Sequence, residues 1–306
     1  MADEKSQAPH DPDREQNPPP YSAGQGEEGL PEYSAGESTS SGEIATSIYR
    51  PFPKVIQGTS RWAMNMEAFT TFKLCGEDEN DFLYMVELNL GLKSGGLIDD
   101  RPGLILHNGT SVQAPVLAAA CYESVDSLSF VDFNIQSIIL LPKLPDQPGG
   151  SINKDLAEYR MLPRMTPDKT VALRFSVETG EKARREEFEW RKCRDKGLIR
   201  PSGFKLYRVS SESATQPIGG ESSRQKDDPN VLAVITWSRA FSTKMLFKIE
   251  FKADGLTGVL GERWSVAVVI TALKMWMLRL HGKLTKTGVK LAEQIHKAIE
   301  EEEARA

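Results

Sequence analysis

Beyond residue 47 the chain alternates between apolar and polar residues in short runs that end at turn residues. Alternation with a period of two is typical of half-buried β-strands. Ten such runs predict strands: Glu67–Leu74, Phe82–Leu90, Gly103–Leu106, Pro115–Tyr122, Ser127–Leu141, Lys169–Glu178, Glu186–Arg194, Phe204–Val209, Val231–Trp237 and Met245–Phe251. Roughly ten to twelve strands at irregular spacing favour a closed barrel or a sandwich. Two segments rich in turn residues, Pro142–Ser151 and Ser210–Asn230, are expected to be exposed loops.

The pattern changes after Gly261, where the segment Glu262–His281 is rich in Val, Ala, Leu, Met and Trp. This segment is too long for a strand and predicts a helix, which Gly282 ends. At helical spacing one narrow stripe collects its polar residues together with one alanine: Arg263, Ala267, Thr271, Lys274 and His281. A helix that is apolar around most of its circumference must be surrounded by protein or by lipid.

A membrane span is one alternative for this helix. The uncharged run Trp264–Leu273 is about half as long as a span requires, and Lys274 and Arg279 interrupt its continuation. A helix through the middle of a β-barrel fits the pattern better, whereas an amphipathic helix on a sheet would need a wider polar face. Lys274 is expected to pair with an acid or to reach the barrel rim, the alternative being a functional group in a cavity.

Residues 284–306 predict a second, amphipathic helix on the surface, because Val289, Ala292 and Ile295 recur near helical spacing. The four glutamates Glu300–Glu303 are unfavourable to the helix dipole at a C-terminus, so fraying is expected there.

Residues 1–47 form a different kind of segment, an acidic tail rich in Pro, Ser and Gly. Its first 45 residues hold ten acids and two bases, a net charge of −8 against −5 for the whole chain. Such a composition cannot bury enough apolar surface to offset its ordering entropy, so the tail is expected to be disordered. The remainder is close to neutral, which argues against nucleic-acid binding. The polar N-terminus resembles neither a signal peptide nor a transit peptide, so a cytoplasmic protein is expected, either free or at the periphery of a membrane.

The tail carries the best functional motif of the chain. Pro18, Pro19, Pro20 and Tyr21 match PPxY, the ligand of WW domains, in which prolines pre-form a polyproline II helix. Pro31 and Tyr33 form a weaker second candidate, and the sequence Tyr-Ser-Ala-Gly begins at the tyrosine of both sites. The alternative is a proline-rich spacer that matches the motif by chance.

Other candidate chemistry is sparse. The three cysteines fit neither a zinc spacing nor a disulfide framework and are expected to be buried and reduced. The glycine-rich segment before the apolar helix, residues 255–261, lacks the spacing of a phosphate-binding loop. No catalytic, metal or cofactor site is predicted, so the chain is expected not to be an enzyme. The densest basic region suggests a salt-bridged hairpin or, alternatively, an anionic-lipid surface; its bases are Lys182, Arg184, Arg185, Arg191, Lys192, Arg194, Lys196 and Arg200.

Many strands followed by one apolar helix resemble the tubby C-terminal-like superfamily, which includes LURP-one-related proteins, phospholipid scramblases and uncharacterised fungal proteins. The resemblance covers roughly residues 48–283 and rests on Leu104–Gly109, Phe247–Phe251 and Trp264–Leu280. It implies a mainly β fold with C-terminal α structure: a closed antiparallel barrel of about twelve strands around a central helix, residues 262–281. The phosphoinositide pocket of tubby proteins and the cysteine-rich segment of scramblases match no positions here.

The first functional hypothesis is therefore a non-enzymatic interaction protein, in which a tubby-like domain contacts a partner surface and the PPxY tail recruits a WW-domain protein. The alternative is a membrane-lipid protein, either phosphoinositide-binding or scramblase-like, that binds an anionic membrane surface.

Overall fold

The computed structural model describes residues 51–59, 70–91, 96–123, 135–193, 203–209, 230–237 and 245–305. The acidic tail and its motifs lie outside these ranges, as do residues 210–229 of the second expected loop. Within these ranges, twelve strands precede two α-helices, α1 (Glu262–Leu280) and α2 (Lys286–Glu303). The strands are β1 (Val55–Thr59), β2 (Thr71–Cys75), β3 (Phe82–Asn89), β4 (Gly103–His107), β5 (Val116–Tyr122), β6 (Ser137–Pro142), β7 (Leu156–Met165), β8 (Val171–Thr179), β9 (Arg184–Lys192), β10 (Gly203–Arg208), β11 (Val231–Trp237) and β12 (Met245–Phe251).

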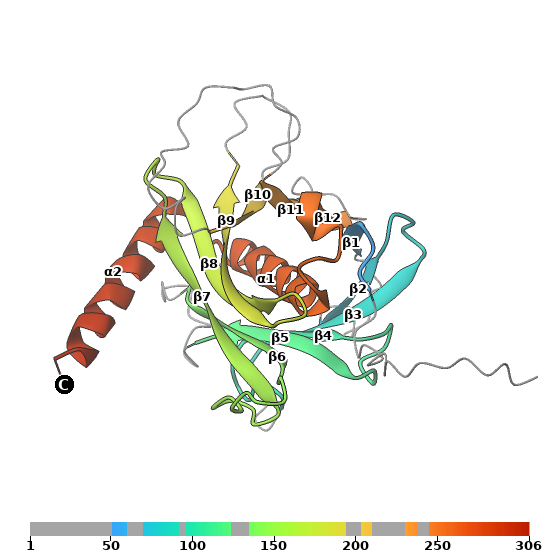
Figure 1. Ribbon diagram of the computed structural model, residues 1–306, viewed down its shortest axis with the longest axis horizontal. Helices are drawn as coiled ribbons and strands as arrows, with labels where there is room; N and C mark the ends of the chain where they lie inside the picture. Colours follow the sequence, from blue (N-terminus) through green and yellow to red (C-terminus); the bar gives the residue numbers. More distant parts are fainter. Residues whose placement is uncertain are drawn as a thin grey trace, which may run out of the picture. The chain divides into compact units, whose positions relative to one another are not determined.

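The strands form one closed barrel in which each pairs with its neighbours in sequence. All pairings are antiparallel, and β1 closes the ring by pairing with both β12 and β2 (Figure 1). The expected closed antiparallel barrel of about twelve strands is confirmed, and the sandwich alternative is wrong.

Two strands of the barrel were not predicted from the sequence. β1 is short, lies close to Pro51 and Pro53, and contains Gly58, all of which weaken a strand pattern. β7 contains Pro163, and a proline within a run argues against a strand because it cannot donate to the ladder. Tertiary pairing overrides both local signals.

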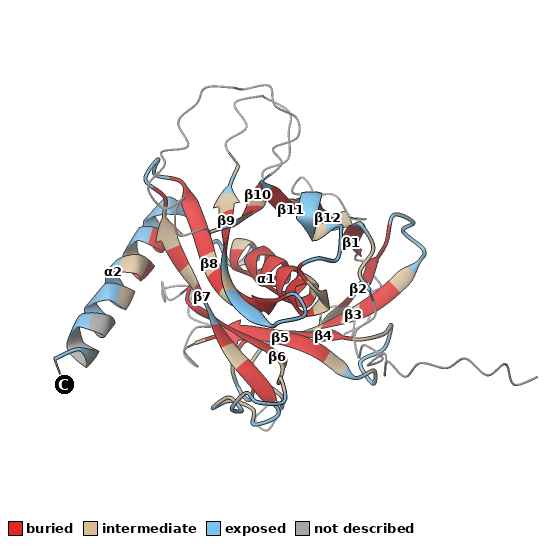
Figure 2. Ribbon diagram, viewed as in Figure 1, coloured by how far each residue is buried: buried red, intermediate tan, exposed pale blue. Residues whose placement is uncertain are grey.

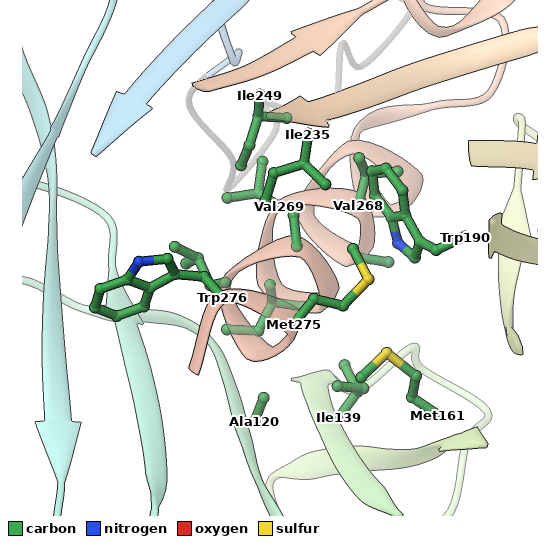
Figure 3. Packing of buried hydrophobic residues seen from close by; sticks show 14 of the residues in the cluster. Ala120, Ile139, Met161, Trp190, Ile235, Ile249, Val268, Val269, Met275 and Trp276 are labelled. Carbon is green, nitrogen blue, oxygen red and sulfur yellow. The ribbon is translucent and has the colours of Figure 1, made fainter. Parts of the chain in front are cut away.

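The helix α1 is the most deeply buried element. Fifteen of its nineteen residues are buried, including both tryptophans (Figure 2). It contacts β4, β5, β6, β8, β11 and β12, and Figure 1 shows strands on either side of its ribbon. Val268 and Val269 lie toward Ile235 and Ile249, whereas Met275 points toward Ile139 and Met161 (Figure 3). An amphipathic helix with one solvent-facing side is therefore excluded.

The chain leaves α1 through a tight turn at Gly282. Gly282 has φ of 67°, the left-handed region that glycine tolerates best. Its N–H donates to the carbonyl of Arg279, and the N–H of Lys283 donates to the carbonyl of Leu278. This pair of hydrogen bonds is the Schellman motif, as the sequence predicted for a glycine stop. The second helix, α2, begins at Lys286, within the predicted segment 284–306, and contacts β7.

Gly58 in β1 leaves room for the side chain of Phe247, which packs against its backbone. An added Cβ at Gly58 would lie 2.4 Å from the ring of Phe247. That ring is fully buried and packs on Phe72 and Trp276, so it has little room to move.

Replacing this glycine by alanine is expected to lower the free energy of unfolding by about 1–3 kcal/mol, the usual cost of overpacking. Gly96→Ala is the matched control, because nothing lies within 4 Å of its added Cβ, and it should change stability by less than about 0.5 kcal/mol. Urea denaturation of both variants measures the difference. In a Phe247→Leu background the cost of Gly58→Ala should shrink, and equal costs in both backgrounds would contradict the steric explanation.

Candidate functional site: an arginine-lined split in the barrel wall

The barrel wall is split between β7 and β8. Their ladder holds only four residue pairs, from Leu162 with Arg174 to Met165 with Val171. The first part of β7, residues 156–161, pairs with β6 alone, and the last part of β8, residues 175–179, pairs with β9 alone. Pro163, which has no N–H to donate, lies one residue from the point where the ladder ends. Beyond that point the two strands present unpaired edges to each other.

A hollow of about 600 Å³ lies over this split. Its floor includes Tyr159 and Phe175, whose side chains belong to the barrel core. Seven charged residues line its walls: Arg101, Arg160, Arg174, Arg185, Glu123, Glu158 and Glu187. The hollow therefore combines an apolar floor with walls that carry one more positive than negative charge.

Most of these charges already have partners. Arg160 lies 3.2 Å from Glu123, and Arg174 lies 3.4 Å from Glu187 and also from the buried carboxylate of Glu189. Glu158 accepts hydrogen bonds from the hydroxyl of Ser151 and the backbone N–H of Ile152.

Arg185 differs from Arg160 and Arg174, the arginines of the hollow that form ion pairs. Its Nε donates to the hydroxyl of Ser176 at 3.0 Å, and its guanidinium lies 5.5 Å from the centre of the Tyr159 ring. It makes no ion pair within the part of the chain that the structure describes. Arg185 is thus held in place by neutral groups and keeps a positive charge for a carboxylate or a phosphate.

Beneath the hollow a buried polar network joins the two separated strands. The Tyr159 hydroxyl donates to Glu178 at 2.7 Å, and Gln147 donates to the same carboxylate at 2.9 Å. Arg263 of α1 donates to Glu178 at 3.1 Å and to the Tyr159 hydroxyl at 2.6 Å. Side chains therefore bridge β7, β8 and the start of α1 where the backbone ladder is missing.

The network also shifts the acidity of its members. Burial raises the pKa of Glu178, but the hydrogen bonds from Tyr159, the backbone and Arg263 outweigh burial and hold that pKa below its ordinary value. Burial and the neighbouring Glu178 raise the pKa of Tyr159. At neutral pH the network therefore holds a carboxylate, a phenol and a guanidinium.

A second polar centre surrounds Lys274 in the middle of α1. Lys274 is fully buried, and its Nζ lies 3.3 Å from the centre of the Tyr122 ring. It has no hydrogen-bond partner among the described residues, although Lys283 lies 4.4 Å above the same ring and His281 accepts or donates at the Tyr122 hydroxyl. The expectation that Lys274 pairs with an acid or reaches the rim is wrong.

The pKa of Lys274 is lowered to about 7, mainly by burial; Cys121 opposes this shift and Lys283 contributes to it. The pKa of His281 is also lowered, first by burial and then by the two lysines. A neutral amine over an aromatic face costs far less to bury than an ammonium, so the ring accommodates Lys274 without a counter-ion.

The residues predicted from the sequence fall into two groups. Pro18, Pro19, Pro20, Tyr21, Pro31 and Tyr33 lie outside the described residues, as do Arg194, Lys196 and Arg200. The rest of the basic region lies on β9 and the turn before it, where Arg191 pairs with Glu189 at 2.6 Å and Glu186 pairs with Arg208 at 2.8 Å. The salt-bridged hairpin is thus confirmed, and only Arg185 from this region lines the hollow.

Sequence reasoning missed the rest of the site. Arg101, Arg160 and Arg174 come from distant parts of the chain, and no spacing connects them. Their convergence depends on strand register, which the sequence alone does not give.

The structure also bears on the cysteines, on metal binding and on membrane-spanning helices. The three cysteines are free, with Cys75 and Cys121 buried and Cys193 partly exposed. Within the described ranges, no three potential ligands are grouped to hold a metal ion. None of the helices described is long and apolar enough to pass through a membrane.

Glu178→Gln is expected to lower the free energy of unfolding at pH 7 by about 3–5 kcal/mol, because it leaves the buried Arg263 without its counter-charge. The native pKa of Glu178 is depressed, so its contribution is present above pH 4.5 and is lost as the pH falls through the native pKa. Urea denaturation at several pH values should show the difference between wild type and variant shrinking in acid. Glu187→Gln, at a half-exposed ion pair, is the control and should cost no more than about 1 kcal/mol; an equal cost at both sites would sink this account.

Lys274→Met is expected to stabilise the protein at pH 6 by about 1–4 kcal/mol, the range for replacing buried charges by apolar side chains. The native pKa, about 7, lies below the ordinary 10.5, so the unfolded chain binds more protons between these values and wild-type stability rises with pH there. The advantage of the variant should therefore decline from pH 7 upward. Lys290→Met, at an exposed position of α2, should show no such trend, and a pH-independent difference for Lys274→Met would contradict the burial of a titrating amine.

The chain was compared with known proteins in three ways. No family model, no curated protein and no solved structure matches it.

Proposed function

We propose that this protein is a non-enzymatic interaction protein of the cytoplasm, in which the barrel binds an anionic partner and the tail recruits a WW-domain protein. The observation that carries the proposal is Arg185, which lines a hollow, is oriented by Ser176 and Tyr159, and makes no ion pair among the described residues. An oriented guanidinium binds a carboxylate or phosphate through two parallel hydrogen bonds.

The barrel itself is proposed to be tubby-like, with α1 as its central helix. Three observations support this assignment: the closed ring of twelve antiparallel strands, the burial of α1 along its length, and its contacts with strands from both halves of the ring. Because side chains fill the space around α1, the recognition site is placed on the outer face of the wall.

The tail is proposed to act as a second binding element. Pro18–Tyr21 matches the PPxY ligand, and the related Pro31 and Tyr33 offer a second site that would add avidity. In a pull-down of the full chain with immobilised WW domains, Tyr21→Ala is expected to reduce recovery by at least about tenfold. Tyr33→Ala should have a smaller effect, and equal recovery of wild type and Tyr21→Ala would remove the tail from the proposal.

The barrel's role is tested with two anionic probes. A fluorescent peptide with one glutamate among uncharged residues is expected to bind the full chain at low salt, and Arg185→Gln should weaken binding by about tenfold. Arg184→Gln is the matched control, because this exposed neighbour does not line the hollow. If both variants bind like the wild type, the hollow is not the binding site.

The alternative function is binding to an anionic membrane lipid, which the same arginines favour. Flotation with phosphatidylcholine vesicles, with and without phosphatidylserine, distinguishes the two. Flotation that requires phosphatidylserine and is lost in Arg185→Gln would favour the lipid. Binding of the peptide without flotation would favour a protein partner.

A further inference from the structure

We infer that the split between β7 and β8 takes an extended peptide segment of a protein partner, which lies between the two strands and places an acidic side chain on Arg185. This inference rests on the proposed function and specifies the class of its ligand. It follows from the unpaired edges of β7 and β8, from the apolar floor of the hollow and from the distribution of charge around it.

The backbone edges come first. Residues 156–161 of β7 and 175–179 of β8 each pair on one side only, and these unpaired sides face the same hollow. A strand edge carries a row of N–H and C=O groups and is a template for another extended chain. Peptides that bind in this way gain affinity from main-chain hydrogen bonds and specificity from alternate side chains. The N–H and C=O of Leu156 already bond to Asn153 and Gly150, so five residues of edge, 157–161, remain, and they span about 17 Å of an added strand.

The side chains around the hollow fit a period of two. Tyr159 and Phe175 form the floor, where side chains on one face of an added strand would pack. The arginines line the walls, where residues on the other face would lie. The expected ligand therefore alternates between apolar and polar residues, with a single acid on the guanidinium of Arg185.

The charges favour a single carboxylate over a polyanionic headgroup. Glu123 pairs with Arg160, and Glu187 with Arg174. Those carboxylates, together with Glu158, would repel a ligand with several negative charges, whereas Arg185 and Arg101 are the arginines of the hollow that make no ion pair among the described residues. Arg101 is already bound by the backbone carbonyl of Glu123, so Arg185 is the group placed to receive a carboxylate. A lipid headgroup would also leave both strand edges without partners.

The test starts from random nine-residue peptides displayed on phage and selected on the immobilised full chain. The strongest binders are synthesised and titrated against wild type, Arg185→Gln and the control Arg184→Gln. Arg185→Gln is expected to weaken binding by about tenfold or more and Arg184→Gln by less than twofold. Each peptide is then scanned with backbone N-methyl groups, which remove one N–H at a time and leave the side chains in place. Losses are expected at successive positions of the paired stretch, because the N–H groups of a strand point alternately to its two neighbours, here β7 and β8.

Hydrogen exchange supplies an independent readout. Bound peptide is expected to slow amide exchange in residues 157–161 and 175–179, and to leave α2 unchanged. Failure to select any binder, or binders that tolerate N-methylation at every position, would overturn the inference. If such binders still depend on Arg185, the proposal that the hollow recognises an anion is kept, and only the proposal of strand addition is rejected. If neither peptides nor anionic vesicles depend on Arg185, the proposed function falls as well.

Discussion

Removing α1 from water is the interaction on which the rest of this structure depends. Each large apolar side chain buried there contributes on the order of 1.5–3 kcal/mol, but the same helix carries polar groups into the interior. Thr271 accepts a hydrogen bond from Trp190 of β9 at 3.0 Å and donates within its own helix. Arg263 is bound by a carboxylate and a phenol, and Lys274 lies on an aromatic ring. Each of these polar groups contacts a different partner in the barrel, and each contact holds a particular strand against the helix.

The hydrogen bonds of Arg263 also explain why the barrel remains closed where the β7–β8 ladder ends. Ending a ladder after four pairs leaves strand edges that normally invite rearrangement or aggregation. Glu178 and Tyr159 close the inner side of this split by bonding to each other and to Arg263. The site on the outside and the anchoring of the helix on the inside thus use the same two strands, so the hollow is supported from below by a buried network.

The sequence predicted those parts of the fold that depend on local pattern. Alternation identified ten strands, and the texture of Trp264–Leu280 identified a buried helix, because both signals reflect which face is removed from water. β1 and β7 were missed because glycine and proline weaken a local pattern that pairing on both sides restores. The hollow was beyond prediction, since Arg101, Arg160 and Arg174 meet only through register. Helical spacing predicts the position of Lys274 on the helix but not the aromatic ring over which its amine lies.

Arg185 makes no ion pair among the described residues, although it lies in a charged hairpin in which other residues form ion pairs. Arg191 on the same strand pairs with Glu189, and Glu186 pairs with Arg208 of β10, so these charges neutralise one another. Arg185 instead donates to Ser176 and lies over the ring of Tyr159, because the carboxylate of Glu178, its register partner on β8, is bonded to Tyr159 and Arg263. The network under Tyr159 is complete without a ligand, so binding at Arg185 requires no rearrangement of α1. A fixed, uncompensated cation over a rigid floor is what preorganised recognition of an anion requires, since little ordering remains to be done on binding.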